Sequence, residues 1–82
     1  APRREKMGYK ELRELDALPA TIASLESELA AVERRLADPA LYAQSPAEVQ
    51  GVVARQEALG KEIETAMARW EWLERRKEEL GS

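Results

Sequence analysis

The 82-residue sequence has no cysteine, no histidine and no phenylalanine, and only four glycines. Without cysteine there is no disulfide and no thiolate chemistry. Without histidine the commonest general base and metal ligand is missing. No apolar run approaches the ~18 residues of a membrane-spanning helix, and no signal peptide is visible. There is also no Walker A loop, no GxGxxG motif and no metal-ligand cluster. We therefore expect this chain to be no enzyme and to hold no cofactor of its own.

The residues that are present are typical of long helices. Charged residues reach 35% and aromatic residues only 5%, while alanine, glutamate, leucine and arginine are abundant. This composition favours long helices or a coiled coil and argues against sandwiches, barrels and Rossmann-type sheets. A mass of 9.2 kDa allows one small domain with a thin core. The chain begins and ends without the punctuation of a domain, so we expect it to be a piece of a longer protein.

Two series of apolar residues recur at alternating steps of three and four residues. The first consists of Leu15, Leu18, Ile22, Leu25, Leu29, Val32 and Leu36. The second includes two polar members and consists of Val49, Val52, Gln56, Leu59, Ile63, Ala66, Trp70, Leu73, Lys77 and Leu80. An average step of 3.5 residues is the repeat of a left-handed coiled coil.

Prolines mark the boundaries of the first helix. Pro19 suits the first turn of a helix, because its missing N–H has no intrahelical partner there. It also pushes Leu18 out of the helical region, so we expect a bend at this point. Pro39 follows the last apolar position of the series and stops the helix. These signals predict a helix over residues 19–37.

The second helix is predicted over residues 46–80. The segment Ser45-Pro46-Ala47-Glu48 has the pattern of a capping box, with serine at the N-cap and glutamate at N3. The connector is then residues 38–45, expected to form one short capped turn with Leu41 and Tyr42 folded back on the tip. A connection this short makes the two helices antiparallel neighbours.

The unequal lengths of the helices predict a third, shorter helix. At 1.5 Å per residue the second helix spans roughly 52 Å and the first roughly 28 Å. The last turns of the longer helix would be uncovered unless residues 9–18 form a helix that packs Leu12 and Leu15 against Trp70 and Leu73.

The predicted fold is therefore all-α: a monomeric antiparallel two-helix coiled-coil hairpin with a short N-terminal helix packed on its open end. Residues 1–8 are expected to form a flexible basic tail, and residues 9–82 the hairpin domain. A parallel homodimeric coiled coil is the rival architecture.

The net charge of −3 conceals an uneven distribution. Residues 1–13 carry five basic and two acidic side chains, and residues 75–82 carry three and two. The middle carries five basic and twelve acidic ones. A hairpin brings both ends together, so eight cations would form one patch that attracts phosphates whatever the base sequence. They are Arg3, Arg4, Lys6, Lys10, Arg13, Arg75, Arg76 and Lys77. The alternative is a solvated helix end, since the helix dipole also favours cations there, and charge alone does not decide between the two.

The two tryptophans are expected to differ. Trp70 is in register with the apolar series and belongs to the predicted core. Trp72 lies two residues further on and points elsewhere. We expect it to pack on the N-terminal helix or on a partner domain, in preference to stacking on a nucleic-acid base.

Three stretches of the chain carry more specific motifs. They are Tyr9-Lys10-Glu11-Leu12-Arg13-Glu14-Leu15-Asp16-Ala17-Leu18-Pro19, Leu36-Ala37-Asp38-Pro39-Ala40-Leu41-Tyr42 and Arg69-Trp70-Glu71-Trp72-Leu73-Glu74. In order and spacing they resemble the opening Y-K-E-x-R-E-L-E-x-L-P, the hairpin connector and the closing R-W-E-x-L-E of the C-terminal domain of Uup-type ABC-F ATPases. One departure is Gly8, where relatives often have Ser or Thr.

The resemblance implies a function. The parent would carry two ATP-binding cassettes, with their ATP and Mg, and no transmembrane domain, which implies a cytoplasmic protein with no membrane contact. Domains of this type are monomeric hairpins that bind DNA and assist the parent in DNA transactions such as transposon excision. The expected partners are DNA, or ribosomal RNA, and the parent's own ATPase domains. The alternative is a protein-interaction or ribosome-contacting spacer with no nucleic-acid affinity of its own.

Overall fold

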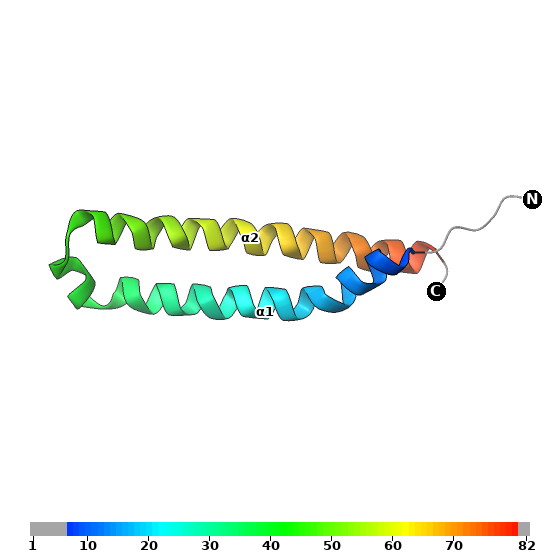
Figure 1. Cartoon of the computed structure of the whole chain (residues 1–82), viewed down its shortest axis with the longest axis horizontal. Coiled ribbons are helices and arrows are strands. Elements are labelled where there is room, and N and C mark those ends of the chain that lie inside the picture. The colour runs from blue at the N-terminus through cyan, green and yellow to red at the C-terminus, as the bar shows by residue number, and fades with distance from the viewer. Residues whose placement is uncertain (1–6, 81–82) are drawn as a thin grey trace, which may run out of the picture.

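The computed structural model describes residues 7–80, which form two long antiparallel helices joined by a short turn (Figure 1). Helix α1 comprises Tyr9–Ala37, the 3₁₀ helix η1 comprises Pro39–Ala43, and α2 comprises Pro46–Glu79. The predicted all-α antiparallel hairpin is confirmed. We call the η1 end the tip, and the end where α1 begins and α2 finishes the open end.

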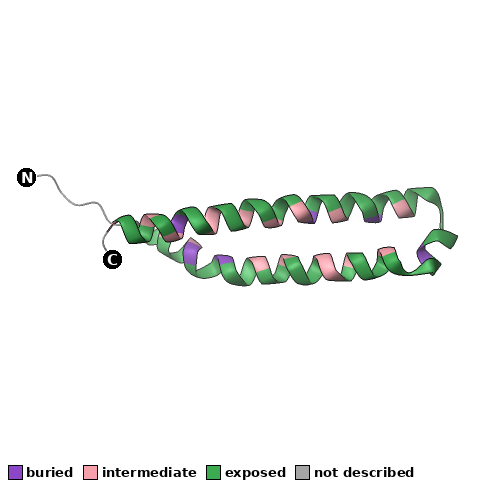
Figure 2. Cartoon of the chain, turned by 180° about the vertical axis from the view of Figure 1, so that it is seen from behind, coloured by how far each residue is buried: buried purple, intermediate pink, exposed green. Residues whose placement is uncertain are grey.

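The core is a narrow strip between the two helices, because two helices cannot enclose one another. Figure 2 shows the buried and half-buried residues on the facing sides of α1 and α2. The fully buried side chains are Leu59 and Leu73, both 0% exposed. Leu15 and Leu18 join Leu73 in a cluster at the open end, against which the half-buried Trp70 packs. The apolar register predicted from the heptads therefore places the seam correctly.

Helix α1 does not end at Leu18 as predicted. It runs unbroken from Tyr9 to Ala37 with Pro19 inside it. A proline within a helix removes one backbone hydrogen bond and bends the axis, and the first turns of α1 slant toward α2 in Figure 1. Leu15 and Leu18, just before the proline, are buried against α2, and this burial offsets the lost bond. The predicted helices 9–18 and 19–37 are thus one bent helix.

The predicted tail, residues 1–8, reaches two residues too far. Met7 is half-buried and packs on the open-end cluster. Gly8 is the N-cap of α1 in an extended conformation. Residues 1–6 of the predicted tail lie outside the described residues.

The tip is closed by local contacts. The Asp38 carboxylate accepts a hydrogen bond from the Ala40 N–H at 2.9 Å, which caps η1. Leu41 is 2% exposed. The hydroxyl of the exposed Tyr42 donates to the Leu36 carbonyl at 2.6 Å. The expected capped turn, with both side chains folded back, is confirmed.

Only one of the two hydrogen bonds of the predicted capping box forms at the start of α2. The Ser45 hydroxyl accepts from the Glu48 N–H at 3.4 Å. The Glu48 carboxylate does not return to the serine and instead binds Arg35 across the hairpin at 3.3 Å. Within residues 7–80, neither long helix has an apolar stretch of the length that a membrane crossing requires.

Candidate nucleic-acid interface

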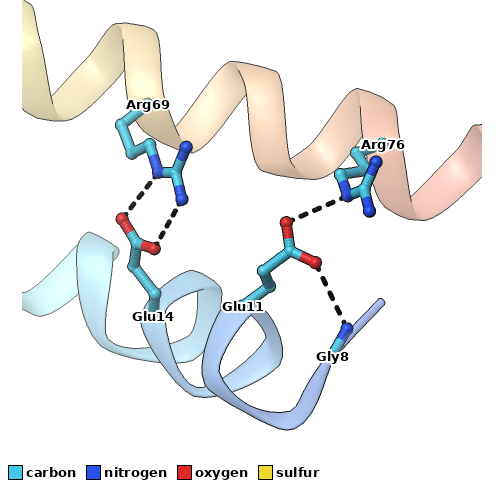
Figure 3. Close-up of polar contacts among 5 residues, drawn as sticks. All are labelled: Gly8, Glu11, Glu14, Arg69 and Arg76. Atoms are coloured by element: carbon cyan, nitrogen blue, oxygen red, sulfur yellow. Dashed lines mark hydrogen bonds and ion pairs between the residues drawn. The ribbon is translucent and has the colours of Figure 1, made fainter. Parts of the chain in front are cut away.

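The first turns of α1 are fastened to the last turns of α2 by two arginines (Figure 3). Arg69 donates from Nε and Nη2 to the two carboxylate oxygens of Glu14, at 2.7 and 2.9 Å. This two-pronged hydrogen bond lowers the pKa of Glu14 and raises that of Arg69. The pair is fully ionised at neutral pH and its charges cancel, so Arg69 contributes little to the attraction of an anion.

Glu11 makes the second connection. One oxygen accepts from the Gly8 N–H at 3.2 Å, and the other lies 2.9 Å from Nε of Arg76 (Figure 3). The buried Nε is not aligned for a hydrogen bond, so this contact is an ion pair only. A capping box needs two hydrogen bonds. Glu11 accepts one from the Gly8 N–H, and the other cannot form because Gly8 has no side chain. Arg76, which the sequence assigned to a phosphate-binding patch, is therefore half-buried and already neutralised.

The same side of the hairpin carries further ion pairs toward the tip. Arg55 donates to Glu28, which raises the pKa of Arg55, and Arg35 pairs with Glu48. Along α1, Glu28 lies two heptads after Glu14, and Arg35 lies one heptad after Glu28. Their partners on α2 are spaced by the same numbers of heptads in the opposite direction along the chain. Sequence reasoning missed this series, although its heptad spacing is visible in the sequence.

The structure brings the other predicted cations of residues 7–80 to the open end. Lys10 and Arg13 lie in the first turns of α1, and Arg75 and Lys77 in the last turns of α2; all four are exposed. Arg13 lies over the Tyr9 ring, 5.6 Å from its centre, and reaches the Tyr9 hydroxyl at 3.5 Å. Three other members of the predicted patch, Arg3, Arg4 and Lys6, fall outside the described residues.

Trp72 stands beside these cations. It is 46% exposed and does not belong to the open-end cluster. The guanidinium carbons of Arg69 and Arg76 lie over its ring, 4.8 and 5.5 Å from the centre. The expected packing of Trp72 on the N-terminal segment is thus indirect: the ring contacts the two arginines, and they in turn bind Glu14 and Glu11 of α1.

The open end carries side chains that are suited to binding an anion or an aromatic ligand. No group of three or more acidic, cysteine or histidine side chains that could hold a metal ion occurs within residues 7–80. What the arrangement offers is exposed cations and an exposed aromatic ring on a helical hairpin. This defines the class of protein as a two-helix coiled coil with exposed cations and an exposed tryptophan at its open end.

Comparison with known proteins identifies the family. Residues 6–75 match the family described as ABC transporter C-terminal domain, and the chain belongs to this family. It is 39% identical over 69 residues to the ATP-binding protein Uup of Escherichia coli K12, covering 84% of this chain and 11% of that protein. It is 36% identical over 76 residues to Uup of Haemophilus influenzae, covering 93% of this chain and 12% of that protein. The chain thus spans only a small part of these relatives.

A solved structure has the same fold. The C-terminal domain of the Uup protein, described as a DNA-binding coiled-coil motif, superposes with a TM-score of 0.81 at 37% identity. The match covers 93% of this chain and 87% of the other. The resemblance that the three sequence motifs indicated is confirmed.

Proposed function

We propose that this chain is a DNA-binding accessory domain of a bacterial ABC-F ATPase, and that its open end holds phosphates without reading bases. The observation that carries the proposal is the meeting of exposed cations from two distant stretches of sequence, Lys10 and Arg13 on α1 with Arg75 on α2. The DNA-binding description of the related coiled coil, at 37% identity, supports the same function.

The ion pairs refine which cations take part. Arg76 and Arg69 are neutralised by carboxylates of α1, so we assign phosphate binding to Lys10, Arg13 and Arg75, which are exposed and form no ion pair within residues 7–80. Each cation that neutralises a phosphate releases a counterion, and affinity then falls with salt by about 0.9 log units per log unit of salt per contact on duplex DNA. Acidic side chains also lie at this end, among them Asp16, Glu71 and Glu74, so the proposed contact depends on where the exposed cations lie and not on a net positive charge.

The test compares two double variants with the same change of charge. Lys10→Gln with Arg75→Gln removes two cations at the open end, and Arg34→Gln with Lys61→Gln removes two exposed cations elsewhere. None of the four forms an ion pair within residues 7–80. Duplex binding is measured by fluorescence anisotropy over a series of salt concentrations.

The open-end variant should weaken binding and reduce the salt slope by roughly 1.8, which corresponds to two lost contacts. The control should leave the slope nearly unchanged. Equal effects of the two variants would contradict the assignment of the open end. A wild-type chain that binds no DNA at all would favour the spacer function instead.

The wider context belongs to the same proposal. The chain acts as a monomeric arm of a longer cytoplasmic ATPase, whose ATP and Mg²⁺ are bound by other domains of the parent. Analytical ultracentrifugation of the 82-residue chain tests the first part, because a parallel homodimer would sediment with twice the mass.

A further inference from the structure

We propose that Trp72 is a stacking site for an unpaired nucleobase, so that the open end prefers single-stranded or locally opened DNA to intact duplex. This inference rests on the proposed function and makes its substrate more specific. It starts from an aromatic side chain that the core does not require. Trp72 is 46% exposed, whereas its neighbour Leu73 is completely buried.

The ring of Trp72 is held in place before any ligand arrives. Arg69 and Arg76 lie one turn to either side of it along α2, and both guanidinium groups contact the ring. Each guanidinium is in turn fixed by a carboxylate of α1, Glu14 or Glu11. An exposed side chain would ordinarily lose rotamer freedom on binding. Here part of that entropy has already been lost on folding, so a stacked ligand costs less to bind.

Two exposed cations of the open end, one on each helix, can bind the phosphates of a strand whose base stacks on the ring. Lys10 precedes Glu14 by one helical turn and so lies on the side of α1 that carries Glu14, which binds Arg69. Arg75 follows Trp72 by three residues on the exposed side of α2. Neither Lys10 nor Arg75 forms an ion pair within residues 7–80. A base on the Trp72 ring would place its neighbouring phosphates between cations of both helices.

An unpaired base is the occupant that satisfies both features. A base within a duplex has both faces covered by its neighbours, whereas an unpaired base offers a free π-face to an aromatic ring. Such stacking tolerates any base, because every base has that face. The site therefore selects the state of the DNA strand and not its sequence.

The first measurement uses two 20-nucleotide single strands with equal numbers of phosphates, one of thymidine and one of abasic residues. Wild-type chain should bind the thymidine strand roughly 5- to 150-fold more tightly, the range expected for one stacked base. Trp72→Ala should bind both strands with the weaker affinity, and Trp72→Phe should retain most of the preference. Binding to a blunt duplex should change less than twofold in either variant.

The matched control is Met67→Ala. Met67 is exposed to a similar extent, at 43%, but lies five residues earlier on α2 and about 140° around the helix. It should leave all affinities unchanged, and circular dichroism of each variant checks that the hairpin remains folded.

The possible outcomes separate the two proposals. Equal affinity of the wild-type chain for the thymidine and abasic strands overturns the stacking site and leaves phosphate binding intact. An equal loss of duplex and single-strand affinity in Trp72→Ala also overturns it, since the ring would then only support the arginines. Failure of the wild-type chain to bind any of the three DNAs overturns the proposed function itself.

Discussion

The two ends of the hairpin are held together in different ways. At the tip, the hydrogen bonds of the turn join residues two to six positions apart, as between Asp38 and Ala40 or Leu36 and Tyr42, and the bond between Arg35 and Glu48 spans only 13 positions. At the open end, the bonds between Glu14 and Arg69 join residues 55 positions apart. The tip is therefore specified by a short piece of sequence. The cations and the aromatic ring of the open end come together only after the chain has folded back.

The largest effect should come from Leu73→Ala. Leu73 is 0% exposed and belongs to the cluster that joins the first turns of α1 to α2. Loss of its side chain should lower the free energy of unfolding by about 2–5 kcal/mol. Urea unfolding followed by circular dichroism measures this. Because the cations on the two helices would no longer be held together, DNA affinity should fall as well.

Leu41→Ala is the counterpart at the tip, where Leu41 is 2% exposed. Amide hydrogen exchange should speed up over residues 39–44 in this variant and over residues 9–18 in Leu73→Ala. If both variants accelerated exchange over the same residues, the hairpin would unfold as one cooperative unit. The proposed difference between a tip held by contacts close in sequence and an open end held by contacts distant in sequence would then be wrong.

A smaller effect is expected from the acid titration of Glu14. Its pKa is lowered in the folded chain by the hydrogen bonds from Arg69. A carboxylate with a depressed folded pKa stabilises the fold above its unfolded pKa, and this contribution disappears as the pH falls through the folded value. Glu14→Gln should therefore be less stable than wild type at neutral pH and similar to it in acid. Both partners are about 40% exposed, which keeps the difference small.

The control for this titration is Glu33→Gln. Glu33 is an exposed residue of α1 that takes part in no ion pair within residues 7–80. Its unfolding free energy, measured by urea titration at each pH, should follow wild type throughout. If the unfolding free energies of wild type and Glu14→Gln ran parallel over the whole pH range, the pair between Glu14 and Arg69 would contribute nothing to stability in solution.

These contrasts show which features the sequence could predict. The heptad series gave the seam, and the proline and serine signals gave the turn and the start of α2, because each depends on residues within a few positions. The predicted division into helices 9–18 and 19–37 was wrong, because the local preference at Pro19 is opposed by Leu15 and Leu18, whose burial favours continuation of the helix. Local rules are least reliable where a long-range contact opposes them.

The location of the candidate site could be predicted from the sequence, but the ion-pair partners of its residues could not. Antiparallel folding alone places Lys10, Arg13 and Arg75 at one end. The pairing of Arg76 with Glu11 depends on which rotamers meet once the helices are in register. Glu48 makes the same point, because its carboxylate had a local partner at Ser45 and a distant one in Arg35, and it binds the distant one.

The smallest predicted effect compares the N-caps of the two helices. Ser45 caps α2 with its hydroxyl, whereas Gly8 at the open end has no side chain to offer. A Cβ at Gly8 would come no nearer than 3.9 Å to Glu11 Oε1, so Gly8→Ser should fit and stabilise the chain by a few tenths of a kcal/mol. Ser45→Gly should cost a similar amount, and the double variant should be close to neutral, as expected for distant sites. Urea midpoints at constant m-value measure all three. A loss of stability in Gly8→Ser would mean that the new hydroxyl displaces Glu11, and hence that the cap of α1 and the ion pair with Arg76 compete for the same carboxylate.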